Sequence, residues 1–297
     1  MLAITAYGMW GLLPVYWKLL QTVSPLVILA HRIVWGFAFS LLMLAFFKRL
    51  PEIRKVLSNK KSIFMLVLSS LLISINWMVY IWAVNDGQVV ETALGYFINP
   101  LVIVFLGMIF LGERLNIAQV VALVLAASGV TIEIVSYAQV PWIALTLAFS
   151  FGLYGLCKKI IAAESLVSLS LETLFAIPLA AAMFIVSYLQ PDFLPGSEHT
   201  TLGISLPDWL VTLVLFCAGP MTALPLWSFG AAARLIPLSS MGFFQYLAPS
   251  ITLILGVTLF KEPFGLVEGL CFACIWAGLV VYSANQFLLW RRSRASA

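Results

Sequence analysis

The stretch YFINPLVIVFLGMIFLGERL, residues 96–115, is apolar enough to cross a membrane, yet it carries the helix-breaking pair Asn99-Pro100 in its first third. A second stretch, APSITLILGVTLFKEPF at 248–264, repeats the same spacing 149 residues downstream. Few letters match, so the signal lies in the spacing, which indicates that two parts of the chain share one fold. The spacing pairs Pro100 with Pro249, Gly107 with Gly256, Glu113 with Glu262 and, without a gap, Gly129 with Gly278.

The composition places the chain among membrane proteins. Hydrophobic residues make up 63% of it and charged residues 9%, with a mean hydropathy of +1.07, whereas soluble domains carry about 25% charged residues. Ten apolar stretches could each cross a hydrocarbon core of about 30 Å, and they do not alternate as barrel strands do. The sequence therefore predicts an all-α polytopic membrane protein with ten transmembrane helices, at 2–19, 26–47, 62–84, 91–111, 115–135, 140–157, 166–189, 207–231, 237–259 and 265–290.

Other classes of function lack their motifs. The sequence contains no P-loop and no H-E-x-x-H or G-x-S-x-G motif, so we expect neither an ATP-driven pump nor an enzyme, and no cofactor. A channel would need a ring of repeated polar groups, and none is evident. The C-x-x-C of Cys271 and Cys274 lies in an apolar span, where packing is expected and a metal is not. Basic residues lie in loops beside spans, so the net charge of +4 does not indicate a nucleic-acid partner.

The distribution of charge predicts the orientation. With the N-terminus in the cytoplasm, thirteen of the sixteen Lys and Arg residues fall on the inner side, including Lys158 and Lys159. Lys18 and Lys261 fall outside, and Arg32 lies within a span. This bias agrees with the positive-inside rule and predicts that both termini are cytoplasmic.

Five helices per half is an odd number, so the second half must run in the opposite direction across the membrane. The loop 48–61 carries six basic residues, whereas its counterpart in the second half carries none. The first helices also echo each other, since WGLLPVYWK (10–18) lies over FGLYGLCKK (151–159). We therefore predict two inverted-topology five-helix repeats, 1–137 and 138–297, within one membrane domain, an arrangement typical of secondary transporters.

Three prolines, Pro100, Pro249 and Pro220, fall near the middle of their spans. Proline removes a backbone hydrogen bond, and in lipid the freed carbonyl is tolerated where it faces protein or a wet cavity. The matched positions predict a central cavity at the repeat interface with the prolines as hinges; ordinary packing kinks are the alternative. Glu113 is expected to accept hydrogen bonds from free backbone amides at the inner turn.

Polar and aromatic residues at the same depth are the candidate substrate-binding groups. An arginine such as Arg32 costs about 2.5–3.5 kcal/mol near the bilayer centre on insertion scales, so a structural anchor and a substrate role are both open. A direct bridge to Glu172 is not expected, because the two depths differ by roughly 14 Å. Tyr and Trp suit a small amphiphilic substrate, since they combine an apolar face with a donor. The candidates are Trp10, His31, Arg32, Asn76, Trp77, Tyr80, Tyr96, Asn99, Tyr154, Phe244, Gln245 and Tyr246.

A family resemblance covers essentially the whole chain. The motifs AHRIVWGF, NWMVYIWAVN, ALGYFINPL, FLGER, AFSFGLYGLCKK and GFFQYLAP resemble, in this order, those of RarD-type proteins in the EamA branch of the drug/metabolite transporter superfamily. The resemblance implies ten helices in two inverted halves and a multi-pass protein of the bacterial inner membrane. It also implies export of small metabolites, with amino acids the best-attested class and drug-resistance phenotypes in some relatives.

Together these features predict a secondary exporter that works by alternating access on small, mostly neutral or zwitterionic amino acids and similar metabolites. A permease for drugs or other metabolites is the alternative. His31, Glu133 and Glu172 are the groups near or within spans that could carry a coupled proton. Their positions away from the midplane favour simple facilitated export. The substrate and the lipid bilayer are the expected partners, and the chain is expected to act as a monomer.

Overall fold

The structure is a computed structural model that describes residues 1–20, 22–85, 89–137, 142–190, 206–259 and 265–295. These residues form twelve α-helices and one 3-10 turn, with no strand among them, so the all-α class is confirmed. The elements are α1 (Leu2–Trp17), η1 (Lys18–Leu20), α2 (Pro25–Phe46), α3 (Leu50–Leu57), α4 (Lys60–Asn85), α5 (Val89–Leu111), α6 (Ile117–Tyr137), α7 (Trp142–Ile160), α8 (Ser165–Leu189), α9 (Asp208–Leu235), α10 (Leu238–Gln245), α11 (Leu247–Thr258) and α12 (Leu266–Ala295).

Each of the ten predicted spans coincides with one helix or with two consecutive ones. In the described part of the chain, seven helical segments are long and apolar enough to cross a membrane. Two shorter apolar helices, at Gly95–Leu111 and Ile117–Ile132, belong to α5 and α6. The first predicted span is covered by α1 and η1 together. The chain is therefore a multi-pass membrane protein.

The segment 48–61, which the sequence suggested as a loop, contains the helix α3. Pro51 lies in its first turn, where the missing N–H would have no intrahelical partner in any case. Val56 is buried while the basic side chains of the last turn stay exposed. This short amphipathic helix was missed because its apolar face is only two turns long.

Of the three proline breaks expected from the sequence, one is visible. α5 continues through Pro100 and α9 through Pro220, whereas the ninth predicted span divides into α10 and α11 at Tyr246. Pro249 is in the first turn of α11, where no intrahelical bond is lost. Pro100 lies in close contact with α10, since a Cβ added at Gly242 would come within 2.6 Å of the Pro100 carbonyl oxygen.

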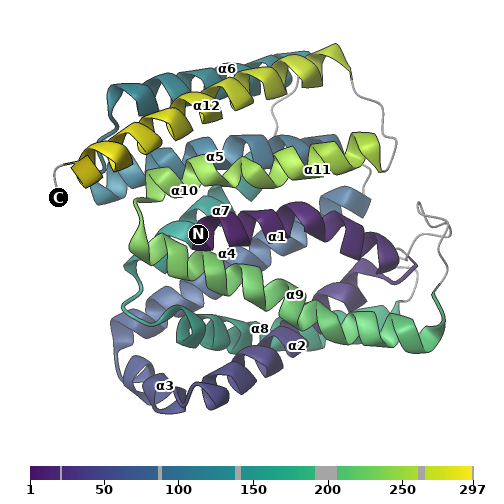
Figure 1. Ribbon diagram of the computed structural model, residues 1–297. Helices are drawn as coiled ribbons and strands as arrows, with labels where there is room; N and C mark the ends of the chain where they lie inside the picture. The colour runs from purple at the N-terminus through teal and green to yellow at the C-terminus, as the bar shows by residue number, and fades with distance from the viewer. Residues whose placement is uncertain (21, 86–88, 138–141, 191–205, 260–264, 296–297) are drawn as a thin grey trace.

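The helices lie side by side with paired neighbours (Figure 1). α6 and α12 form a pair at one edge, and α2 and α8 pack together at the opposite edge. Between them α5 packs on α7 and α10, while α1 packs on α9 and α11. Both chain ends lie on the same side of the bundle as α3. Exchanging the two halves turns one set of pairs into the other, because α5–α7 corresponds to α11–α1 and α4–α7 to α9–α1.

Close contacts follow the 149-residue spacing. A Cβ on Gly129 would lie 2.7 Å from the carbonyl oxygen of Cys271, and a Cβ on Gly278 would lie 2.7 Å from that of Ala122. Since Gly129 pairs with Gly278 and Ala122 with Cys271 in the repeat, one contact is made twice. It holds α6 and α12 together as a two-fold axis requires.

The first helix of each half makes a second contact of this kind. A Cβ on Gly11 would lie 2.7 Å from Ile251, and one on Gly152 would lie 2.9 Å from Val102. Ile251 and Val102 are again repeat partners, so α1 meets α11 as α7 meets α5. The boundary after residue 137 stays a prediction, and Glu262 lies outside the described residues.

Glu113 closes the end of α5 onto the other half of the chain. Gly112 adopts a left-handed conformation with φ of +63°, and the carboxylate of Glu113 accepts hydrogen bonds from the N–H groups of Leu238 (2.6 Å) and Ser239 (2.7 Å). Negative charge is favourable at a helix N-terminus such as that of α10. The absence of a side chain at Gly107 leaves space for the Glu113 carboxylate, because a Cβ there would lie 2.8 Å from Glu113 Oε2. The amides that the sequence predicted for Glu113 thus belong to α10.

A glycine comparison tests the α6–α12 contact. Gly129→Ala places a methyl group 2.7 Å from a backbone oxygen that cannot yield, whereas Gly8→Ala meets nothing within 4 Å. Overpacking of this kind costs about 1–3 kcal/mol, so Gly129→Ala should lower the Tm of the purified protein in detergent. Gly8→Ala, the matched control, should leave it unchanged. Equal Tm values for the two variants would contradict the close contact.

Candidate functional site

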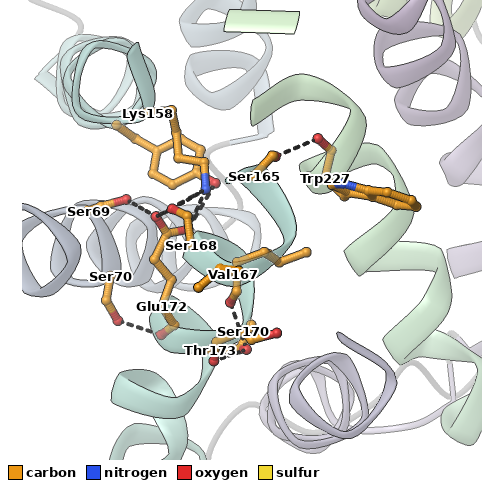
Figure 2. Close-up of polar contacts among 12 residues, drawn as sticks. Ser69, Ser70, Lys158, Ser165, Val167, Ser168, Ser170, Glu172, Thr173 and Trp227 are labelled. Carbon is orange, nitrogen blue, oxygen red and sulfur yellow. Dashed lines mark hydrogen bonds and ion pairs between the residues drawn. The ribbon is translucent and has the colours of Figure 1, made fainter. Parts of the chain in front are cut away.

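Lys158 of α7 and Glu172 of α8 form an ion pair buried inside the bundle (Figure 2). The ammonium nitrogen lies 3.1 Å from each carboxylate oxygen, and the two side chains are 2% and 3% exposed. Ionisable groups within membrane-spanning helices are costly and mark a functional site by default. This pair is therefore the centre of the candidate site.

Hydroxyl groups from three helices complete the pair. Glu172 Oε1 accepts from Ser69 of α4 at 2.7 Å and from Ser168 of α8 at 2.9 Å, and Oε2 accepts from the Tyr154 hydroxyl at 3.4 Å. Lys158 also donates to the Ser168 hydroxyl at 2.8 Å. Since α4 belongs to the first half and α7 and α8 to the second, the network joins the two halves.

Helical spacing explains how these groups converge. Tyr154 and Lys158 are four residues apart on α7, as are Ser168 and Glu172 on α8, so each pair shares one helix face. Gly230 of α9 makes room, because a Cβ there would lie 2.7 Å from Lys158 Cε. The sorting of Lys158 as an inner-loop cation is thus corrected. The signal that could have found it is the four-residue spacing from Tyr154.

Arg32 of α2 forms a second polar centre. Its guanidinium carbon lies 4.9 Å from the ring centroids of both Trp17 and Trp77, and its Nε–H donates to the Thr222 hydroxyl at 3.0 Å. The contact with Thr222 depends on a close crossing of α2 and α9, since a Cβ on Gly219 would lie 2.3 Å from the α2 backbone. Four helices therefore build the surroundings of Arg32, and, as expected, Glu172 is not its partner.

Two predicted site residues make local contacts that orient helices. His31 Nδ1 accepts a hydrogen bond from Trp35 Nε1 at 3.0 Å, one turn along α2. The Asn76 side-chain amide donates to the Leu147 carbonyl at 2.9 Å and to the Ser150 hydroxyl at 3.0 Å. Asn76 thus ties α4 to α7, and these contacts support the bundle and not the Arg32 surroundings.

An aromatic cluster links the first helix to the ion pair. Trp10 packs against Tyr7 with ring centroids 5.4 Å apart, and against Phe151 and Phe229 at 5.6 Å. Tyr154 stacks on Phe229 at 5.8 Å with an interplanar angle of 13°. The rings come from α1, α7 and α9, so Trp10 and Tyr154 belong to one packed aromatic cluster between the two halves. That these aromatics line a cavity stays a prediction.

Predicted residues near the α5–α10 contact are mostly buried. Asn99 and Gln245 are 4% and 6% exposed, and their side-chain oxygens have no hydrogen-bond partner among the described residues. The Tyr246 hydroxyl donates to the Phe97 carbonyl, which lies 149 positions earlier, at 3.2 Å. Phe244 packs against a tyrosine ring of α12. Unpaired buried oxygens are rare and need an explanation, so Asn99 and Gln245 stay candidates.

Two hollows of the described part lie away from these groups. One of about 350 Å³ lies between α5 and α6 and is lined by apolar side chains such as Leu101 and Phe105. Another of about 100 Å³ lies at the ends of α4 and α7 beside Asn59. Tyr80 and Tyr96 line neither of these two hollows, and their ring centroids lie 6.1 Å apart. The central cavity therefore stays a prediction, and the interface around the ion pair is packed.

Comparison with known proteins adds the decisive observation. The model of the EamA-like transporter family matches residues 1–134. An uncharacterized transporter, YojE of Bacillus subtilis, is 46% identical, with 98% of this chain and 95% of that protein covered. This chain belongs to the EamA-like transporter family. It is of the RarD type, since the Protein RarD of Escherichia coli is 38% identical, with 99% of this chain and 96% of that protein covered.

Further similarities of this EamA-family chain concern a solved structure and a more distant relative. A solved structure titled "Crystal structure of protein" has a TM-score of 0.70 at 21% identity, covering 94% of this chain and 95% of its own, and thus shares the fold. The chloramphenicol-sensitive protein RarD of Pseudomonas aeruginosa is 26% identical, with 98% and 95% covered. The family and these names indicate a transporter and not an enzyme. Among the described residues no group of three or more His, Cys, Asp or Glu gathers as metal ligands would.

The buried ion pair gives a sharp stability test. Removing one partner of such a pair costs about 3–5 kcal/mol, because the other charge is left buried alone, whereas replacing both can be neutral. Lys158→Met and Glu172→Gln should therefore each lower the Tm strongly, and the double variant Lys158→Met/Glu172→Leu should recover much of the loss. The control is the surface pair of Arg49 and Glu52, which is 46% and 42% exposed.

Neutralising Glu52 should change stability by at most about 1 kcal/mol, as for other exposed pairs. If Glu172→Gln costs no more than Glu52→Gln, the buried pair does not carry the stability assigned to it.

Proposed function

We propose that this protein is a secondary transporter that exports small metabolites, amino acids in the first place, from the cytoplasm by alternating access between its two halves. The observation that carries the proposal is the placing of the buried charges. Lys158, Glu172 and Arg32 lie within helices that pack across the interface of the halves, where inverted-repeat transporters bind their substrates. Charges at such positions are expensive and therefore functional by default.

The orientation belongs to the same proposal. Both chain ends lie on one side of the bundle together with α3, and the basic residues of α3 and its flanks follow the positive-inside rule. We place this side in the cytoplasm of a bacterial inner membrane. The ion pair then lies toward the cytoplasmic side, and Arg32 toward the outside.

A permease for drugs or other metabolites is the second candidate. The aromatic cluster around Trp10 and Phe229 offers apolar surface suited to uncharged or bulky molecules. The name of one relative, chloramphenicol-sensitive protein RarD, associates that protein with a neutral antibiotic. A substrate panel that includes chloramphenicol separates the two candidates.

Reconstituted protein should carry radiolabelled amino acids into or out of liposomes with saturable flux. The panel should contain neutral amino acids, one basic and one acidic amino acid, and chloramphenicol, with and without an imposed pH gradient. Labelling of Ser58→Cys with a membrane-impermeant maleimide reports how the protein is inserted. Saturation by chloramphenicol alone would favour the second candidate, and the absence of flux for every compound would refute transport of these classes.

We further propose that Pro249 acts as a hinge at the junction of α10 and α11, with Pro100 and Pro220 as secondary bending points. Pro249→Ala supplies an N–H that can bond to the Gln245 carbonyl and join the two helices. The variant should express normally and transport more slowly, because a continuous helix resists bending. Pro51→Ala in α3 is the control and should transport at the original rate. Unchanged flux in Pro249→Ala, Pro100→Ala and Pro220→Ala would identify the three prolines as packing kinks.

A further inference from the structure

Two cations of the described spans, Lys158 and Arg32, differ in how their charge is neutralised. Lys158 is neutralised by Glu172 and bonded to Ser168, so its charge is satisfied within the protein. Arg32 has no ion pair with any carboxylate whose position the structure describes, and its one hydrogen bond given by the described residues is that from Nε to Thr222. A cation within a membrane span is costly and is expected to have a partner. Among the carboxylates that the structure describes, none neutralises Arg32, and this contrast with Lys158 favours a negative partner supplied by a ligand.

The contacts of Arg32 leave the N–H donors of its terminal amino groups for a negatively charged partner. Trp17 and Trp77 lie against the guanidinium at 4.9 Å and stabilise its charge through their π-systems without using an N–H donor. Thr222 uses Nε–H alone. The two terminal amino groups of the guanidinium form a planar fork that matches both oxygens of a carboxylate. Arg32 is only half-buried.

We propose that Arg32 binds the carboxylate of the transported molecule. Its guanidinium is held in place by the indole rings of Trp17 and Trp77. Tyr80 and Tyr96 are further electrostatic neighbours of Arg32. Tyr96 is 48% exposed and so lies at the surface of the bundle. The substrate class is thus a small molecule with one free carboxylate beside an apolar or aromatic part; its being carried across the membrane rests on the proposed function.

Charge sets what the site rejects. A cationic molecule would meet the guanidinium as a like charge, and a neutral one would leave the fork without an acceptor. An amino acid and its N-acetyl derivative both keep the carboxylate, whereas the carboxamide loses it and keeps the cationic amine. Phenylalanine, N-acetylphenylalanine and phenylalaninamide therefore separate recognition of the carboxylate from recognition of the amine and of the ring.

The test measures binding to the purified full-length protein in detergent, through the rise in Tm with ligand concentration. Leucine and phenylalanine, each as the free amino acid, the N-acetyl form and the amide, are compared on the original protein. The variants are Arg32→Gln, Arg32→Lys and, as control, Arg234→Gln, which removes an exposed cation at the end of α9. Liposome flux is measured in parallel.

We expect at least one of the carboxylates to raise the Tm in a saturable way, and the amides not to. Affinity should fall roughly tenfold to a hundredfold in Arg32→Gln, as for loss of a charged hydrogen bond, and remain unchanged in Arg234→Gln. Arg32→Lys keeps the charge and loses the fork, so it should bind weakly and still prefer the carboxylate; it also serves if Arg32→Gln does not fold.

Binding of amides as tight as that of acids, equal affinity in the Arg32 variants, or no stabilisation by any carboxylate overturns the proposal. Carboxylate binding that depends on Arg32 without any flux would instead refute transport and leave the site standing. Flux that is insensitive to Arg32→Gln would refute the Arg32 site and leave transport standing.

Discussion

Everything in this fold is governed by the low polarity of the bilayer, in which each charge and each backbone group must find its partner within the protein. The Lys158–Glu172 pair obeys this constraint most directly. Four donors converge on one carboxylate, from Ser69, Ser168, Tyr154 and Lys158 itself. Because these donors come from α4, α7 and α8, satisfying one charge fixes three helices and both halves.

The same constraint explains the end of α5. A helix end leaves N–H groups without partners, and the start of α10 solves this with a carboxylate that comes from the other half. Glu113 reaches Leu238 and Ser239 only because Gly112 turns the chain with a positive φ and Gly107 leaves space for the carboxylate. The motif FLGER therefore forms a hydrogen-bonded contact between the halves, in which Gly112 turns the chain and Glu113 supplies the carboxylate.

The two halves share their helix contacts but differ in their buried charges. The glycine contacts of α6 with α12 repeat across the two-fold almost unchanged. The buried charges do not repeat: the position 141 residues after Trp17, which packs on Arg32, is occupied by Lys158, which pairs with Glu172. A transporter with equivalent halves would present equivalent surfaces to both sides. Different charges at related positions therefore give the two ends of the bundle different chemistry.

The sequence determined the features that depend on one helix or on spacing. Hydropathy predicts the ten spans because each must cross the same thickness of hydrocarbon, and the 149-residue spacing predicts which glycines are equivalent in the two halves. Composition and the ordered motifs likewise identify the family. The division of the ninth span at Tyr246 was harder to predict from the sequence, because a proline in an apolar run permits both a kink and a break. A hydrogen bond from the Tyr246 hydroxyl to the Phe97 carbonyl accompanies the break.

Only the tertiary structure decided which charges are buried. Lys158 and Lys159 are adjacent and read alike in the sequence, yet Lys158 lies over the gap at Gly230 beside Glu172, whereas Lys159 reaches the Ile236 carbonyl at the end of α9. Likewise Arg32 was recognised as costly, but its neighbours Trp17 and Thr222 lie 15 and 190 positions away in the chain. Hydropathy and spacing describe single helices, while the partner of a buried charge is set by how several helices cross.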